Sequence, residues 1–233
     1  MLSVGETGST NADLLALAAS GAAEGTWLCA ERQTGGRGRQ GRTWSSPAGN
    51  FYGSALVRLR PGDPPAPSLS LIAGVALHEV VAAFLPDARD LRLKWPNDLL
   101  LGGAKLAGIL LERSNEAVVI GIGVNLAHHP DLPDRPTISI AAQGGTVSPA
   151  IFADTLVEAV ARWVDRWRHG GVAAVRAAWL QRAHPHGTPI RLHEADGAAV
   201  SGLFEGLDGD GALILRLADG RARVIHAGDV FLL

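Results

Sequence analysis

The longest mostly apolar run of this chain, residues 68–85 ("SLSLIAGVALHEVVAAFL"), limits the folds that the chain can adopt. The run has the length of a helix, and apolar residues lie on nearly every side of that helix, so most of its surface must be buried. No uninterrupted apolar run approaches the roughly 18 residues of a membrane span, so we expect no such span. The helix is therefore predicted to lie against a sheet.

Strand-like runs that would form this sheet lie on both sides of the helix in the sequence. Turn residues separate the later runs: the Gly-Gly pair at 102–103 and Asn115 before Glu116 favour an antiparallel meander. Five runs are predicted to be strands: residues 26–31, 50–61, 91–95, 105–112 and 117–126.

The remaining pattern indicates further helices and a change of architecture near the C-terminus. Three runs are predicted to be helices: residues 9–21, 148–171 and 171–184. Trp163 and Trp167 lie four residues apart on one helix face, and we expect them to pack in the core. After Gly187 short strands alternate with Gly and Asp turns, which indicates a small β-barrel. We therefore expect a larger domain, residues 1–184, followed by a C-terminal barrel, residues 185–233.

The charge and the cysteine content narrow the class of protein. The formal net charge is −2, so no overall positive field attracts nucleic acid, and any anion site must be local. The single cysteine, Cys29, excludes a disulfide within the chain, and its apolar neighbours indicate a buried structural thiol. The N-terminal residues lack the basic start and apolar core of a signal peptide. These features predict a cytoplasmic protein.

A loop that is rich in glycine and arginine lies between the first two predicted strands. The stretch "QTGGRGRQGRTW", residues 33–44, contains four glycines and three arginines. Gly36, Gly38 and Gly41 match G-x-G-x-x-G, but no helix follows them to hold a pyrophosphate, so a dinucleotide fingerprint is rejected. The loop also lacks the Gly-Lys-Ser/Thr of a P-loop.

Two further interpretations of this glycine–arginine loop remain besides anion binding. An RNA-binding tail is disfavoured because such segments are usually terminal and repeated, and a plain surface hairpin would not explain three arginines. Glycine lets backbone N–H groups approach an anion, while Arg37, Arg39 and Arg42 supply forked, permanent positive charge. We predict a clamp for a phosphate or an acyl phosphate, mobile before its ligand binds.

Other polar clusters have both structural and functional interpretations. Asn97 and Asp98 either complete the turn after Pro96 or contribute to a site, whereas Lys105, which begins an apolar strand, must reach a rim or an anion. Asn125 follows two strand glycines, where a backbone can approach a flat ligand closely.

The first helix and the histidines also have structural interpretations. Thr10 with Asp13 matches a helix capping box, although the spare groups of "STN" also suit a small polar head group. The histidine pairs at 128–129 and 184–186 lack zinc-site spacing and are expected to lie on the surface.

Taken together and in this order, "STN", "QTGGRGRQGRTW", "KWPNDL", "KLAGILLE" and "GIGVN" resemble the biotin protein ligases, from about Ser9 to the C-terminus. The resemblance implies an α/β (α+β) catalytic domain with a mixed, largely antiparallel sheet flanked by helices, and a C-terminal SH3-like barrel. It implies a ligase that converts biotin and ATP, with Mg²⁺, to biotinyl-5′-AMP. The biotin then passes to a specific lysine of a biotin carboxyl carrier domain.

The resemblance also implies roles for individual residues. The residues expected to bind biotin are Ser9, Thr10, Asn11, Gln33, Arg37, Gly38, Arg39, Lys105 and Gly108. Those expected to bind the adenylate are Arg39, Arg42, Trp44, Asn97 and Asn125. Lys105, Arg37 and Arg39 would act on the reacting groups, and Asp98 is a candidate magnesium contact or a group that positions the incoming lysine.

The chain departs from the family pattern in two respects. Gln40 stands where some relatives have Arg, so the loop carries one charge less. Only eight residues precede Ser9, too few for the winged helix of relatives that act as repressors, so we expect no DNA binding. The alternatives are a lipoate–protein ligase, which lacks these motifs, and a non-catalytic biotin-binding module, which would not need Lys105. A monomer and a homodimer both remain open.

Overall fold

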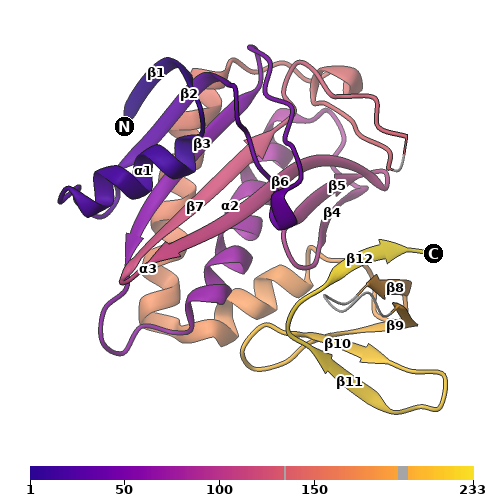
Figure 1. The fold of residues 1–233 in the computed structure, drawn as a ribbon. Helices are drawn as coiled ribbons and strands as arrows, with labels where there is room; N and C mark the ends of the chain where they lie inside the picture. The colour runs from indigo at the N-terminus through magenta and orange to yellow at the C-terminus, as the bar shows by residue number, and fades with distance from the viewer. Residues whose placement is uncertain (134, 194–198) are drawn as a thin grey trace.

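A mixed seven-stranded sheet forms the centre of the larger domain (Figure 1). The computed structural model describes residues 1–133, 135–193 and 199–233. The strand order is β1 (Leu2–Thr7), β2 (Trp27–Gln33), β3 (Phe51–Arg58), β7 (Ala117–Val124), β6 (Ala104–Ser114), β5 (Asp98–Leu101) and β4 (Leu91–Lys94). Only the β1–β2 pair is parallel among these neighbours. The predicted mixed, largely antiparallel sheet is confirmed.

Helices cover both faces of this sheet. The helices α2 (Leu69–Phe84) and α3 (Pro149–Leu180) share one large apolar core with one face of the sheet, and α1 (Thr10–Ala19) packs on the other face. The alternation of β3 shows the division, because Ala55 and Val57 belong to the large core while Leu56 contacts the α1 side.

The burial of α2 and of the tryptophans agrees with the expectation from sequence. Residues 66–84 do meet the length and composition of a membrane span, contrary to our prediction, but most of them are buried against the sheet and α3, as in a core helix. Trp163 and Trp167 are buried as predicted, and their indole N–H groups donate to Glu79 and Ser68.

Two strands of the larger sheet were not predicted. β1 is an edge strand whose residues are nearly all exposed, so it lacks the apolar alternation that identifies a strand. β5 has the opposite character: all four of its residues, "DLLL", are buried, and it follows the turn at Pro96 so closely that no strand is predicted there. Periodicity alone cannot identify either kind of strand.

A second sheet of five antiparallel strands forms the C-terminal part, as predicted for a small β-barrel. Its order is β11 (Ala222–Ile225), β10 (Leu213–Arg216), β9 (Ala199–Leu207), β8 (Pro189–His193) and β12 (Asp229–Leu232). It contacts the larger domain closely: the Trp95 indole N–H donates to the Gly211 carbonyl at 3.1 Å, and Lys94 Nζ donates to the Val230 carbonyl at 2.9 Å. The exact boundary between residues 184 and 185 stays a prediction.

The long helix α3 is interrupted where the sequence pattern divided it. Gly171 has φ 69° and ψ −172°, a conformation that is open almost only to glycine, so the chain breaks there into two helical parts. The neighbouring Gly170 is helical, and a Cβ on it would meet only Ala174 at an ordinary 3.6 Å.

We expect Gly171→Ala to lower the free energy of unfolding by about 1–3 kcal/mol, because alanine is strained in that backbone conformation. The matched variant Gly170→Ala should be neutral or stabilising by up to about 1 kcal/mol, since it replaces glycine inside a helix. Urea unfolding followed by circular dichroism measures both. Equal losses in the two variants would contradict this account of the break.

Candidate active site

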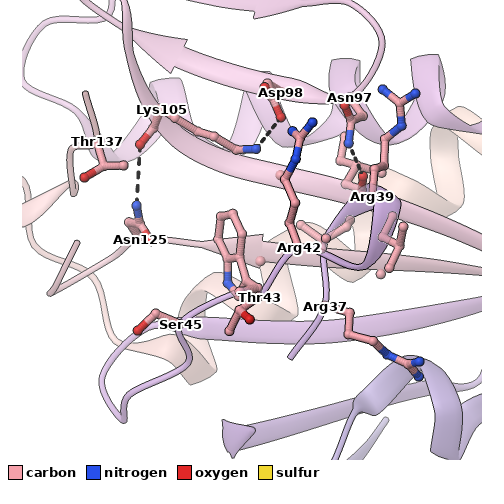
Figure 2. A pocket seen from close by; sticks show the side chains of 18 of the residues that line it. Arg37, Arg39, Arg42, Thr43, Ser45, Asn97, Asp98, Lys105, Asn125 and Thr137 are labelled. Carbon is pink, nitrogen blue, oxygen red and sulfur yellow. Dashed lines mark hydrogen bonds and ion pairs between the residues drawn. The ribbon is translucent and has the colours of Figure 1, made fainter. Parts of the chain in front are cut away.

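One cavity of about 370 Å³ is lined by residues from the start of α1, the glycine–arginine loop, the β6–β7 hairpin and the start of β12. Figure 2 shows the part of it around the glycine–arginine loop and Lys105. Every predicted site residue lines it: Ser9, Thr10, Asn11, Gln33, Arg37, Gly38, Arg39, Arg42, Trp44, Asn97, Asp98, Lys105, Gly108 and Asn125. The cavity is in the size range of ligand-binding pockets. The structure therefore brings together residues up to 116 positions apart in sequence, although what each of them binds stays a prediction.

The end of the cavity at α1 is lined by hydroxyl and amide groups. Ser9 caps the helix by accepting from the Ala12 N–H, so the predicted capping box of Thr10 with Asp13 is wrong. The Thr10 backbone N–H instead donates to Gln33 Oε1 at 2.9 Å, and the Asp13 carboxylate accepts from Thr7. Because Gln33 ends β2, this contact ties the sheet to the helix start.

The hydrogen bonds behind Thr10 determine which role its hydroxyl can take in the cavity. Asn11 directs its NH₂ at the Leu110 carbonyl and Glu112, both acceptors, so its oxygen faces Ser54 and accepts from that hydroxyl at 2.6 Å. The Thr10 proton is then left with Ser54 at 2.8 Å or Gln33 at 3.1 Å as acceptors. Thr10 therefore presents a lone pair to the cavity.

The same network shows what the sequence analysis missed. The Asn11 side chain is only 4% exposed and is used to fix α1 on the sheet, so any contact of that side chain with a ligand is secondary. Ser54 and Glu112 do not line the cavity but orient the residues that do. Nothing in the strand patterns around these two residues marked them.

Two glycines of the cavity floor, Gly108 and Gly123, leave room for the Trp44 ring. A Cβ on Gly123 would come within 2.6 Å of the Trp44 indole nitrogen, and a Cβ on Gly108 within 3.2 Å of the same ring. Lys105 Nζ lies 5.4 Å from the Trp44 ring centre, within cation–π range. The Trp44 Nε1 has no hydrogen-bond partner among the described residues although it is buried. The Trp44 ring therefore lies directly against this floor.

Lys105, Asp98 and Lys94 form a largely buried ion cluster beside this floor, of which Figure 2 shows the pair of Lys105 with Asp98. The Asp98 carboxylate lies 2.6 Å from Lys105 Nζ and 2.9 Å from Lys94 Nζ. Burial alone would raise the pKa of Asp98, but the two ammonium groups outweigh it and hold that pKa at about 2. Burial lowers the pKa of Lys105, and Asp98 opposes this effect. Asp98 thus keeps a buried lysine charged.

The side-chain amides of Asn97 and Asn125 bind backbone carbonyls. Asn97 donates to the Ile109 carbonyl at 2.6 Å, and Asn125 donates to the Ile138 carbonyl at 3.0 Å. Both residues line the cavity, but these bonds support the structural interpretation of Asn97 as a residue that completes its turn. Their contact with a nucleotide stays a prediction.

The glycine–arginine loop closes one wall of the cavity as a short hairpin. The Gly38 N–H donates to the Arg42 carbonyl at 2.7 Å, and Arg37 is bridged to Thr43. β3 follows the loop, in agreement with the rejection of a dinucleotide fingerprint. Gln40, where some relatives have Arg, accepts from the Arg42 guanidinium at 2.8 Å and so supports a neighbouring charge.

The charges of the lining are strongly unequal. Six cationic side chains face two carboxylates, a local net charge of +4 in a chain of net charge −2: Arg37, Arg39, Arg42, Lys94, Lys105 and Arg135 against Asp98 and Asp229. The prediction of a local anion site therefore has a physical basis here. Arg135 and Asp229 were missed, because each lies far in sequence from the recognised motifs.

The remaining candidate groups do not form a metal site within the described parts of the chain. No three His, Cys, Asp or Glu side chains cluster there. His128, His129 and His186 are exposed as predicted, but His184 is half-buried, and burial lowers its pKa to about 4. Burial raises the pKa of Cys29 to about 11, as expected for a structural thiol.

Comparison with known proteins gives a consistent result over nearly the whole chain. Residues 7–125 match the biotin/lipoate A/B protein ligase family, and residues 186–233 match the biotin protein ligase C-terminal domain. A biotin–(acetyl-CoA-carboxylase) ligase of Paracoccus denitrificans is 44% identical over 97% of both chains. One of Mycobacterium tuberculosis is 40% identical over 97% of this chain and 86% of its own length.

Solved structures share the fold. A biotin protein ligase from Aquifex aeolicus in complex with biotin and ATP has a TM-score of 0.85 at 23% identity, covering 100% of this chain and 97% of that one. One from Leishmania major in complex with biotinyl-5-AMP has a TM-score of 0.70 at 26% identity, covering 97% and 98%.

The buried cluster predicts a specific pH dependence of stability. Because the pKa of folded Asp98 lies below its ordinary value of 3.8, its contribution to stability is present above about pH 4 and is lost as the pH falls towards 2. Asp98→Asn should be less stable at pH 7 by about 3 kcal/mol, because two buried ammonium groups lose their partner. The difference from the unsubstituted protein should then shrink between pH 4 and pH 2.

Urea unfolding at pH 7, 4, 3 and 2 measures this difference. Asp210→Asn, at an exposed turn of the C-terminal sheet, is the matched control and should follow the unsubstituted protein at each pH. A difference for Asp98→Asn that stays constant down to pH 2 would contradict the proposed cluster.

Proposed function

This chain belongs to the biotin/lipoate A/B protein ligase family, among its biotin protein ligases, and from that premise we propose that it is an ATP-dependent biotin–(acetyl-CoA-carboxylase) ligase. A carboxylate oxygen of biotin attacks the α-phosphorus of ATP, pyrophosphate leaves, and biotinyl-5′-AMP forms. The ε-amine of a lysine on a biotin carboxyl carrier domain then attacks the acyl carbon. The amide forms, AMP departs, and the amine loses a proton.

The observation that supports this proposal best is that one cavity joins a neutral hydrogen-bonding end to a cationic end. At the neutral end Thr10 presents a lone pair, while Ser9 and Gln33 have N–H and O–H groups, which suits the N–H and C=O of a cyclic urea. At the other end a local charge of +4 suits a carboxylate next to a nucleotide phosphate. Biotin and ATP together have these features.

Lys105 is suited to act where charge develops. Its ammonium is buried, is kept charged by Asp98, and lies between the glycine floor and the glycine–arginine loop. Both steps move negative charge around one phosphorus, so fixed positive groups stabilise the transition state more than the bound substrates. Arg37 and Arg39 add charge from the opposite wall, and the Trp44 ring covers the place of the adenylate.

The glycine–arginine loop has a second task, which is to exclude water. A mixed anhydride of a carboxylic acid and a phosphate hydrolyses readily in the open. A loop that closes over it protects it until the acceptor amine arrives. Glycine gives this loop the freedom to open, and the arginines give it attraction to the bound intermediate.

Magnesium enters with ATP as part of the substrate. Both carboxylates of the cavity are engaged by cations, Asp98 by lysines and Asp229 by arginines. A small ion of this kind binds readily to phosphate oxygens and water, with few protein ligands. We therefore place the ion on the nucleotide, and the contact of Asp98 with it remains a weaker part of the proposal.

The proposal includes the partner and the setting of the reaction. The acceptor is a biotin carboxyl carrier domain of a carboxylase, as the names of the relatives from P. denitrificans and M. tuberculosis indicate for those proteins. We keep a cytoplasmic location and the absence of DNA binding as predictions. A monomer and a homodimer are both compatible with the proposal.

Incubation with biotin, ATP, Mg²⁺ and an isolated carrier domain, followed by mass measurement of the carrier, tests the function. We expect one added biotinyl group, no addition without ATP, and none on a carrier whose acceptor lysine is replaced by arginine. Lipoyl transfer in place of biotinyl transfer would favour the lipoate ligase. Biotin binding without pyrophosphate release would favour a binding module, and steeply salt-dependent oligonucleotide binding would favour an RNA-binding protein.

Lys105→Ala should slow the formation of biotinyl-AMP by about 100-fold or more, because the lost charge acts mainly in the transition state. The dissociation constant of biotin should change by less than about threefold, since the neutral end of the cavity stays intact. Single-turnover pyrophosphate release and calorimetric titration measure the two quantities. Lys105→Arg, which keeps the charge, should lose less rate, and equal losses in rate and binding would refute the role.

Arg39→Gly should release biotinyl-AMP into solution, because the loop loses a charge and its hydrogen bond to the Gly228 carbonyl while the cavity stays in place. The released intermediate would label lysines on a bystander such as serum albumin. Arg221→Gly, in an exposed turn of the C-terminal sheet, is the control and should label no more than the unsubstituted protein. Without bystander labelling by Arg39→Gly, the clamp would have to be given up.

A further inference from the structure

The C-terminal sheet places one carboxylate in the cavity. Asp229 begins β12, the strand on the side of the small sheet that faces the larger domain in Figure 1, and its side chain is 15% exposed. It forms an ion pair with Arg42 and lies 3.8 Å from the Arg39 guanidinium. Arg39 also donates to the neighbouring Gly228 carbonyl at 3.1 Å. Two arginines of the glycine–arginine loop thus meet the first residues of β12.

The backbone hydrogen bonds of this loop lie mostly within it or near its ends. The hairpin bond from Gly38 to Arg42 and the bridge between Arg37 and Thr43 lie within the loop, and the loop has almost no apolar side chain to bury. The arginine contacts with β12 therefore join its tip, residues 39–42, to a separate sheet. They determine whether the tip lies over the cavity or away from it.

Guanidinium geometry allows these arginines to bind β12 and a ligand at the same time. An arginine has five N–H donors in a planar fork, so one edge can bind a protein acceptor while the other faces a phosphate. Arg39 uses Nη1 for the Gly228 carbonyl, and Figure 2 shows Arg39 and Arg42 among the residues that line the cavity. Asp229 consequently orients the arginines without taking the whole of their binding capacity.

The strength of this contact fits a latch that must open in each cycle. Arg42 is 41% exposed at its side chain, so water and salt weaken its pair with Asp229. The two carboxylates are similarly buried, but the lysines that pair with Asp98 are each only 19% exposed, so water reaches that cluster less easily. The ion pair between Arg42 and Asp229 is therefore suited to hold the loop closed and still to let it open.

We propose that Asp229 is a positioning residue of the ligase reaction: through Arg39 and Arg42 it latches the glycine–arginine loop to the C-terminal sheet and so retains biotinyl-AMP until the carrier lysine arrives. This inference rests on the proposed function. It assigns the retention of the intermediate to an acidic residue about 190 positions away from the loop in sequence.

The test measures the release of preformed biotinyl-AMP from the complete chain without carrier. The complex is formed with biotin and radiolabelled ATP, diluted, and filtered at intervals. Asp229→Asn should release the intermediate roughly three- to tenfold faster, which is the range for loss of a partly exposed charge pair with two arginines. Asp219→Asn, an exposed acid in the β10–β11 turn, is the matched control, and Asp229→Glu should stay within about twofold of the unsubstituted protein.

Salt dependence separates the latch from a merely structural role. Release from the unsubstituted protein and from Asp219→Asn should accelerate as NaCl rises from 50 mM to about 500 mM, because screening weakens the exposed pair. Release from Asp229→Asn should start fast and change much less. If the asparagine variant melts at a lower temperature, all variants are compared at a temperature at which circular dichroism shows each of them fully folded.

Each outcome has a distinct meaning. Unchanged release by Asp229→Asn overturns the latch, and slower release with tighter ATP binding overturns it in favour of a carboxylate that competes with phosphate. Equal salt responses of the asparagine variant and the unsubstituted protein also overturn it. If the unsubstituted protein forms no biotinyl-AMP at all, the proposed function fails instead, so the two failures are distinguishable.

Discussion

Two ammonium groups and one carboxylate lie buried together where β4, β5 and β6 meet, and much of the site depends on this cluster. Asp98 keeps Lys105 charged in a place where burial favours the neutral amine. Lys94, the other partner, also donates to the Val230 carbonyl and so ties the cluster to the C-terminal sheet. Asp98 therefore keeps Lys105 charged and, through Lys94, helps to hold the C-terminal sheet against the cavity.

The two ends of the cavity are built by different physical means. At the neutral end a chain of hydrogen bonds through Ser54 and Asn11, which ends on Glu112 outside the cavity, makes the Thr10 hydroxyl an acceptor toward the cavity. At the other end an excess of positive charge attracts an anion whose phosphorus will react. A substrate that is a neutral ring with a carboxylate tail fits across this change only in one orientation, which presents its carboxylate to the phosphate.

Helices and strands with a clear local pattern could be predicted from the sequence. Residues that reach the cavity only through contacts between distant segments could not. The helix α2 and the strands β2, β3, β6 and β7 were identified because apolar periodicity and turn residues define them locally. The edge strand β1 has no buried face and β5 has no exposed one, so neither shows alternation. All residues taken from the motifs line the cavity, whereas Arg135 and Asp229 reach it through folding alone.

The cavity needs both a permanent ion cluster and a reversible one, and burial separates them. Under the proposed function, the charge of Lys105 stabilises a transition state and should not reorganise, and its ion pair with Asp98 lies largely out of solvent, where the attraction is little screened. Under the same proposal the loop must open and close, and its ion pair with Asp229 uses Arg42, whose side chain is 41% exposed, so water competes for that pair. Burying Arg42 would be expected to hold the loop closed against its substrates, and exposing Lys105 would weaken the effect proposed for it on the reacting phosphate. The two ion pairs, Lys105 with Asp98 and Arg42 with Asp229, can therefore serve different purposes because they differ in their access to solvent.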